Sequence, residues 1–305
     1  MAIIVNTNLS ALKTQKNLTS ATNGMNKALN RMSTGFKINS AKDDAAGLYV
    51  ATGLDTQIRG SKVAKDNVAT GTNVLQTIEG DLDNILTNIQ RIRDLAVQGA
   101  NSIYGDEEIE AMKSEVEQRI DECRRIADAS NFNGLKLLDG TGKLAEHGLR
   151  LQVGANADPN GNMIELEQAM FAERTDCSTL GNTVTADDVT NGDYDGMSIE
   201  EAFEAGIMDN ASACADFIAV CDAAIDTISS RKSTLGAVMN RLESAETCLT
   251  TTIENNTAAK STIMDADIAE ESANFTKYQI LQQTSSALLV QANALPQIAI
   301  SLVQG

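Results

Sequence analysis

The most regular hydrophobic pattern in the chain lies between Val74 and Gln98. Apolar side chains recur there at alternating spacings of three and four residues, at Leu75, Ile78, Leu82, Ile85, Ile89, Ile92 and Ala96. This heptad pattern is typical of an α-helix that packs lengthwise against another helix. The intervening residues are mostly polar or charged, so the opposite face of this helix suits water or a further partner.

The same helical period predicts further helices before and after this seam. It covers residues 8–34, continues from residue 45 through the seam to about residue 99, and returns from Ile109 to Ile126. We expect Gly35 to end the first helix, the run 42–44 to cap the second, and Asp106 to cap the third. Glycines within the second helix indicate close packing against a neighbour, or bends, at Gly53, Gly60, Gly71 and Gly80.

The second half of the chain contains a partner for the seam. From Ile199 the helical period resumes and becomes a second seam, made of Cys214, Phe217, Ile218, Cys221, Ile225, Ile228, Leu235, Met239, Leu242, Leu249 and Ile253. A final amphipathic helix is predicted over 265–303, and its polar positions are rich in amides, like those of residues 8–34. We therefore expect the two chain ends to pack beside each other.

Residues 131–166 change to the period of short strands separated by turn sequences. The strand-like pieces lie around Leu135–Leu138, Leu149–Val153 and Met163–Leu166. The sequence thus predicts a mainly α fold: a long antiparallel coiled-coil rod with paired terminal helices and a small antiparallel β-hairpin patch.

The composition of the chain argues against several classes of function. The formal net charge of −18 disfavours binding to nucleic acid or to an anionic membrane. No apolar run approaches the about 18 residues that would span a bilayer. The N-terminus lacks the features of a cleaved secretory signal, so the chain is cytosolic or leaves the cell by another route.

The candidate chemistry is sparse. The sequence has five cysteines without a C-x-x-C pair and one histidine, His147, so we expect no enzyme, metal site or cofactor. We expect buried structural thiols, with redox or cross-linking roles as the alternative. Asn191, Asp193, Asp195 and Gly196 resemble half of a calcium loop, but Ala202 stands at the final ligand position. We favour a capping box made by Ser198 and Glu201.

Several stretches, in order, resemble bacterial flagellin, the subunit of the flagellar filament. In the first half they are residues 4–12, 33–47, 90–98 and 131–134, and in the second half 235–242, 265–270 and 291–297. The resemblance covers roughly residues 1–166 and 215–305. It implies a structural protein that is exported unfolded through the flagellum's own channel and then polymerises. A hook–filament junction protein is the alternative.

The resemblance also implies a division of the chain. Residues 1–44 and 265–305 would form the two halves of an inner helical domain, disordered in the free monomer. Residues 45–166, with the hairpins, and 198–264 would form the rod, and 167–197 a minimal outer region. Polymerisation is assigned to the apolar faces of the terminal helices, at Leu9, Leu12, Met25, Leu29, Leu281, Leu288, Leu295 and Leu302.

Partners follow from the same resemblance. They are further copies of the chain, an export chaperone at the C-terminal helix, and the filament cap and hook-junction proteins. Flagellins also carry a site for Toll-like receptor 5, which matches Gln90, Arg91 and Leu95, with Glu115 as the acidic contact on the next helix. Asp94 departs from that motif, since a Glu is more usual there.

Overall fold

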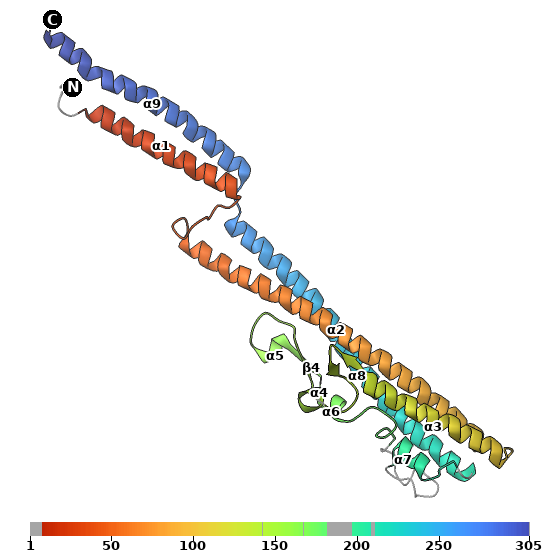
Figure 1. Cartoon of the computed structure of the whole chain (residues 1–305). Helices are drawn as coiled ribbons and strands as arrows, with labels where there is room; N and C mark the ends of the chain where they lie inside the picture. The colour runs from red at the N-terminus through yellow and green to blue at the C-terminus, as the bar shows by residue number, and fades with distance from the viewer. Residues whose placement is uncertain (1–7, 142, 167, 182–196, 209–210, 305) are drawn as a thin grey trace. The chain divides into compact units, whose positions relative to one another are not determined.

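The structure, a computed structural model, is mainly helical, as predicted. It describes residues 8–141, 143–166, 168–181, 197–208 and 211–304. The long helices are α1 (Leu9–Thr34), α2 (Ala45–Gly99), α3 (Asp106–Ala129), α8 (Ala211–Met264) and α9 (Ile268–Gln304) (Figure 1). The chain divides into a terminal unit, Met1–Ile58 with Ile253–Gly305, and a central unit, Arg59–Thr252. Each unit is described by itself.

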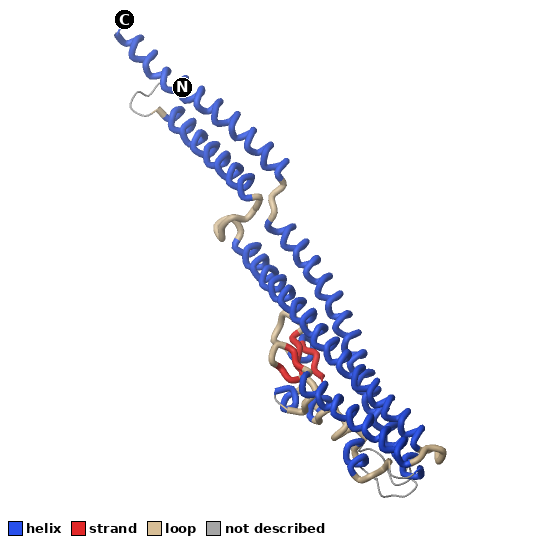
Figure 2. The backbone as a smooth tube through the Cα atoms, turned by 45° about the vertical axis from the view of Figure 1, so that its right-hand side comes forward, coloured by secondary structure: helices blue, strands red, loops and turns tan. Residues whose placement is uncertain are grey.

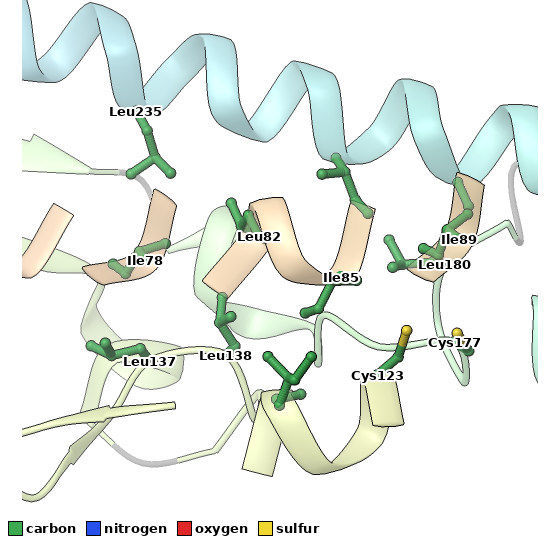
Figure 3. Packing of buried hydrophobic residues seen from close by; sticks show 14 of the residues in the cluster. Ile78, Leu82, Ile85, Ile89, Cys123, Leu137, Leu138, Cys177, Leu180 and Leu235 are labelled. Atoms are coloured by element: carbon green, nitrogen blue, oxygen red, sulfur yellow. The ribbon is translucent and has the colours of Figure 1, made fainter. Parts of the chain in front are cut away.

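The core of the central unit is built on the heptad seam of α2. All seven seam residues, Leu75 to Ala96, are at most 1% exposed. Figure 3 shows that Leu235 of α8 lies over this seam, while Leu138 contacts it from the opposite side. The second predicted seam is therefore the partner of the first, and its fully buried members are Cys214, Phe217, Cys221, Ile228, Leu235 and Leu242.

Polar contacts between α2 and α8 fix their direction. Lys65 Nζ donates to Thr250 Oγ1 at 3.1 Å, and Arg93 Nε lies 2.5 Å from Asp222 Oδ1. Residue numbers rise along α2 while those of the partners fall along α8. Within the central unit the two helices are thus antiparallel, as the sequence predicted.

Helix α3 packs along the same core and buries the predicted stripe of Val116, Ile120, Cys123 and Ile126. The predicted cap at Asp106 is wrong by one position, because Gly105 is the N-cap and Asp106 is the first helical residue. The backbone N–H of Gly105 donates to the Glu108 carboxylate at 2.9 Å. The N–H group of the N-cap is thus paired with a side chain of the helix itself.

The predicted antiparallel strands form two separate pairs. Strand β1 (Asn131–Phe132) pairs with β2 (Leu135–Lys136), and β3 (Leu149–Gln152) pairs with β4 (Met163–Leu166), both antiparallel. The first pair is closed by Asn133 and Gly134, both at positive φ, a turn that favours these two residue types. Figure 2 shows the strands beside the long helices of this unit.

The segment after Ser198 also differs from prediction, because the helix does not run on from Ile199. A short helix, α7 (Ile199–Glu204), is followed by a turn, and α8 starts at Ala211. Gly206 has φ +84° in that turn, a conformation that stops a helix. The capping box is confirmed: Glu201 N–H donates to Ser198 Oγ at 3.2 Å, and Ser198 N–H to the Glu201 carboxylate at 3.0 Å.

Shorter helices complete the central unit, and two glycines of α2 lie against strand β3 and the loop that follows it. The helices are α4 (Lys143–His147), α5 (Pro159–Asn162) and α6 (Ala169–Ala172). A Cβ at Gly71 would lie 2.5 Å from a methyl group of Leu151, and one at Gly60 would lie 2.8 Å from Ala155. Close packing therefore explains these two glycines, whereas a Cβ at Gly53 or Gly80 would meet no other described part of the chain within 4 Å.

In the terminal unit α1 and α9 lie side by side, as predicted (Figure 1). Asn8 Nδ2 donates to the carbonyl of Ala292 at 2.7 Å near one end, and Arg31 pairs with Glu271 at 2.8 Å near the other. The helices are therefore antiparallel. The linkers pair too: Lys37 N–H donates to Met264 O at 2.6 Å.

Two predicted helix boundaries in this unit are confirmed, whereas α9 begins at Ile268, three residues later than predicted. Gly35 ends α1 in the left-handed conformation, with φ +74°. Asp44 caps α2, since its carboxylate accepts a hydrogen bond from the Gly47 N–H at 2.9 Å.

The prediction of buried thiols holds for four cysteines and is wrong for one. Cys123, Cys177, Cys214 and Cys221 are buried, whereas Cys248 is exposed. Cys248 precedes Leu249 of the seam, so its side chain turns away from the core face of α8.

The seam generates a test of the fold. Leu82 is 1% exposed, so Leu82→Ala should lower the free energy of unfolding by about 2–5 kcal/mol through lost burial and a cavity. Val97 lies on the same helix but is 47% exposed, and Val97→Ala should change stability by about 0.5 kcal/mol or less. Denaturant unfolding followed by circular dichroism measures both, and equal effects would contradict the assigned core.

Candidate functional site

Helices α2 and α3 of the central unit present a paired arginine and glutamate. Arg91 Nε donates to Glu115 Oε1 at 2.8 Å, and its Nη2 donates to Oε2 at 3.2 Å, so the contact is bidentate. The side chains remain 42% and 35% exposed, respectively. The structure therefore brings together two residues that the sequence places on separate helices.

A second arginine belongs to the same surface. Arg119 lies one turn after Glu115 on α3, with its guanidinium 3.6 Å from that carboxylate. It also donates to the side-chain oxygen of Asn88 on α2 at 3.0 Å. This link was not found from the sequence, because it depends on which faces of α2 and α3 meet.

The contact between Arg91 and Glu115 shifts the pKa values of both side chains. The hydrogen bonds that Arg91 donates to Glu115 raise the pKa of Arg91 and lower the pKa of Glu115. A carboxyl with a lowered folded-state pKa stabilises the fold above its unfolded pKa and loses that contribution as pH falls through the lowered value. Exposure to solvent keeps this contribution small.

The other two predicted residues of this site differ from each other. Gln90 is exposed beside Arg91, whereas Leu95 is 2% exposed and belongs to the hydrophobic core. Leu95 follows Ile92 by three residues, a spacing that already places it near the buried face of α2. The surface of this site consists of Gln90, Arg91, Glu115 and Arg119, and we call it the α2–α3 polar surface.

The terminal helices present a different kind of surface. Large apolar side chains are exposed on both helices, at Leu9, Leu12, Leu29, Leu281 and Leu288, while Met25 is partly buried. The side chains of Leu295 and Leu302 lie outside what the structure describes. We call these exposed residues the terminal leucines.

Small residues make the contact between α1 and α9 instead. Ala21 and Ala28 of α1 and Ala292 of α9 are buried. Gly24 lies so close to α9 that a Cβ there would be 2.6 Å from the ring of Tyr278. Because the terminal leucines are left outside this contact, the pair of helices is an incomplete core.

Ion pairs near this contact are also internal to the unit. Arg31 is bound to Glu271, and Lys27 lies 3.0 Å from Asp43. A hydrogen bond from Lys27 lowers the pKa of Asp43. Neither contact provides a nucleophile or a paired acid and base.

Metal chemistry finds no support in the described part of the chain. Within it no three His, Cys, Asp or Glu side chains are grouped so as to hold a metal ion. The half calcium loop at residues 191–196 lies outside the described residues. No described helix is long and apolar enough to cross a membrane.

Models of a known protein family match both the N-terminal and the C-terminal helical parts of the chain. A model of the bacterial flagellin N-terminal helical region matches residues 5–143, and a model of the C-terminal helical region matches residues 218–303. Flagellin of Halalkalibacterium halodurans is 36% identical over 302 residues, covering 99% of this chain and 100% of that protein.

Two further relatives align almost end to end. Flagellin of Bacillus subtilis is 35% identical over 98% of this chain and 99% of its own length. The flagellar filament core protein flaB2 of Brachyspira hyodysenteriae is 35% identical over 99% of this chain and 100% of its own. The chain therefore belongs to the bacterial flagellin family.

Proposed function

We propose that this flagellin polymerises into the flagellar filament through its terminal leucines. The observation that carries the proposal is their exposure: Leu9 and Leu12 are 76% and 70% exposed. Fully burying one such side chain is worth about 1.5–3 kcal/mol, so a contact that covers several of them is strongly favoured. Other copies of the chain provide that cover.

The domain division belongs to the same proposal. Residues 1–44 and 265–305 form the inner helical domain, 45–166 and 198–264 the rod, and 167–197 the outer region. The contact between α1 and α9 uses alanines and a glycine, so the isolated pair buries little apolar area and gains most of its stability in the filament. Folding of the ends is thereby coupled to assembly.

Export and partner proteins complete the proposal. The chain leaves the cell unfolded, with an export chaperone on α9, and meets the filament cap and the hook-junction proteins during assembly. The exposed apolar residues of α9, such as Ile280 at 57% and Val290 at 71%, supply the surface that a chaperone covers. Relatives named flagellin that align over nearly the whole chain do not favour the hook–filament junction alternative.

Truncation tests the role of the ends. The full chain should extend filament seeds, and a chain lacking residues 1–40 and 265–305 should remain monomeric because it lacks the terminal leucines. Electron microscopy and sedimentation after seeding measure both. Filaments from the truncated chain would overturn the proposal, and failure of the full chain to extend seeds would point to a junction protein.

A single substitution tests the leucines themselves. Leu12→Ser removes one exposed apolar side chain and should raise the monomer concentration in equilibrium with filaments about tenfold, since about 1.4 kcal/mol corresponds to that factor. Gln15→Ser, another exposed position on α1, is the matched control and should leave this concentration nearly unchanged. Similar values for the two variants would argue against leucine-driven assembly.

We also propose that the monomer is recognised by Toll-like receptor 5 at the α2–α3 polar surface. The specific observation is that Arg91 and Glu115, from two helices, form one half-exposed bidentate pair beside the exposed Gln90. Charged hydrogen-bonding groups held in place at a surface lose little freedom on binding. Leu95 supports this surface from the core.

Arg91→Ala tests that site. It should weaken receptor binding at least about tenfold, because a hydrogen bond to a charged group is worth about 1.5–3 kcal/mol. Arg125→Ala breaks a comparable exposed arginine–glutamate pair on α3, with Glu122, and should retain binding. Titration of the monomer with the receptor ectodomain measures both, and equal losses would contradict the assignment.

A further inference from the structure

Two buried cysteines from distant parts of the chain meet in the central unit. Cys123 of α3 is 0% exposed, and Cys177, in the segment after α6, is 1% exposed. Their side chains are hydrogen-bonded to each other, and Figure 3 shows the two sulfur atoms next to one another. Both are free thiols here.

The surrounding structure holds the two cysteines in place by contacts that do not involve their sulfurs. The carbonyl of Cys177 accepts a hydrogen bond from the Glu200 N–H at 2.9 Å. The Glu200 carboxylate is in turn bound by Arg124, the residue after Cys123. The backbones that carry the two thiols are therefore tied together through α7.

A further contact anchors the segment that contains Cys177. The N–H of Thr175 donates to the carbonyl of Leu138 at 2.9 Å, and the buried Asp176 accepts a hydrogen bond from the Ser178 N–H at 3.0 Å. Because both sides of Cys177 are fixed, the two sulfurs stay close without a bond between them. Such proximity favours reaction within the pair over reaction with other thiols.

We propose that Cys123 and Cys177 form an intramolecular disulfide when the chain folds in the presence of a small-molecule disulfide. The thiolate of one cysteine attacks that oxidant, forming a mixed disulfide and releasing one small thiol. The thiolate of the other then attacks the protein sulfur of the mixed disulfide and releases the second. In all, the protein loses two hydrogens and the oxidant becomes two thiols.

The bond forms during folding because the folded state protects the thiols. Both side chains are buried, and the hydrogen bond that the Cys177 thiol makes to Cys123, together with burial, raises the pKa of Cys177. Exchange needs the thiolate and access for the oxidant, and the folded chain provides little of either. The reduced, folded protein should accordingly resist oxidation.

The remaining cysteines are competitors of different strength. Cys221 is buried near enough to Cys177 to influence its titration, so it is the strongest competitor. Cys214 lies against Gly99 of α2, and Cys248 is exposed. The arrangement favours the 123–177 bond because these two thiols are hydrogen-bonded to each other and their backbones are tied together through α7.

The disulfide would stabilise the folded central unit. This inference does not depend on the proposal about filament assembly. The disulfide would link α3 to the segment after α6, and the loop that it closes contains both strand pairs. Closing a long loop restricts the unfolded chain and so stabilises the folded one. Disulfides of this kind persist outside the cell, where conditions are oxidising.

The test uses the full-length chain with Cys248→Ser, which removes the exposed thiol that would cross-link copies. The reduced, unfolded protein is refolded in a mixture of reduced and oxidised glutathione, free thiols are blocked, and peptides are mapped by mass spectrometry. We expect one dominant 123–177 linkage. We also expect an unfolding temperature several degrees higher than for the reduced protein, a gain that reductant removes.

Matched variants separate the pair from the other thiols. Cys177→Ala should abolish both the linkage and the thermal gain, whereas Cys214→Ala, at another buried thiol, should keep both. Circular dichroism checks that each variant refolds. Linkages spread among several cysteines, a dominant bond to Cys221, or an oxidised chain less helical than the reduced one would overturn the proposal.

Timing is tested on the folded protein. Reduced protein that is already folded should form the bond at least about tenfold more slowly than protein refolding in the same glutathione mixture, since burial suppresses the thiolate. Equal rates would overturn closure during folding.

Discussion

Burial of the α2 heptad seam is the constraint on which the central unit depends. Its seven apolar side chains are almost completely removed from water, and α3, α8 and the loop segments all pack against them. Each buried side chain of this size contributes about 1.5–3 kcal/mol, more than an exposed ion pair provides. The charged contacts, such as Arg93 with Asp222, therefore set direction and register, while the seam supplies the stability.

The terminal unit is built on the opposite principle. Its helices approach each other through alanines and Gly24, and they leave the terminal leucines exposed. One chain thus combines a complete core with an incomplete one. This division is what the proposed assembly requires, since the terminal leucines gain apolar contacts from other copies of the chain.

The sequence predicted the features that depend on local pattern. The two seams, the stop at Gly35, the cap at Asp44 and the capping box at Ser198 all arise from residue types at fixed spacings. It did not predict the cap at Gly105 or the break at Gly206, where one turn conformation decides the boundary.

The exposure of Cys248 was missed, although its position directly before Leu249 of the seam already turns its side chain away from the core face of α8. For the α2–α3 polar surface, the sequence provided Arg91 and Glu115 by resemblance. It could not provide their link to Arg119 and Asn88, which depends on packing between helices. The burial of Leu95, by contrast, was already readable from its distance to Ile92.

The pairing of α1 with α9 joins the two ends of the chain, and Asn8 contacts Ala292 across a sequence separation of 284 residues. Loops of that length close slowly compared with local contacts. The terminal unit therefore cannot form until both α1 and α9 have been synthesised. A chain that lacks either helix leaves the other without its partner, so this contact forms only in a molecule that contains both.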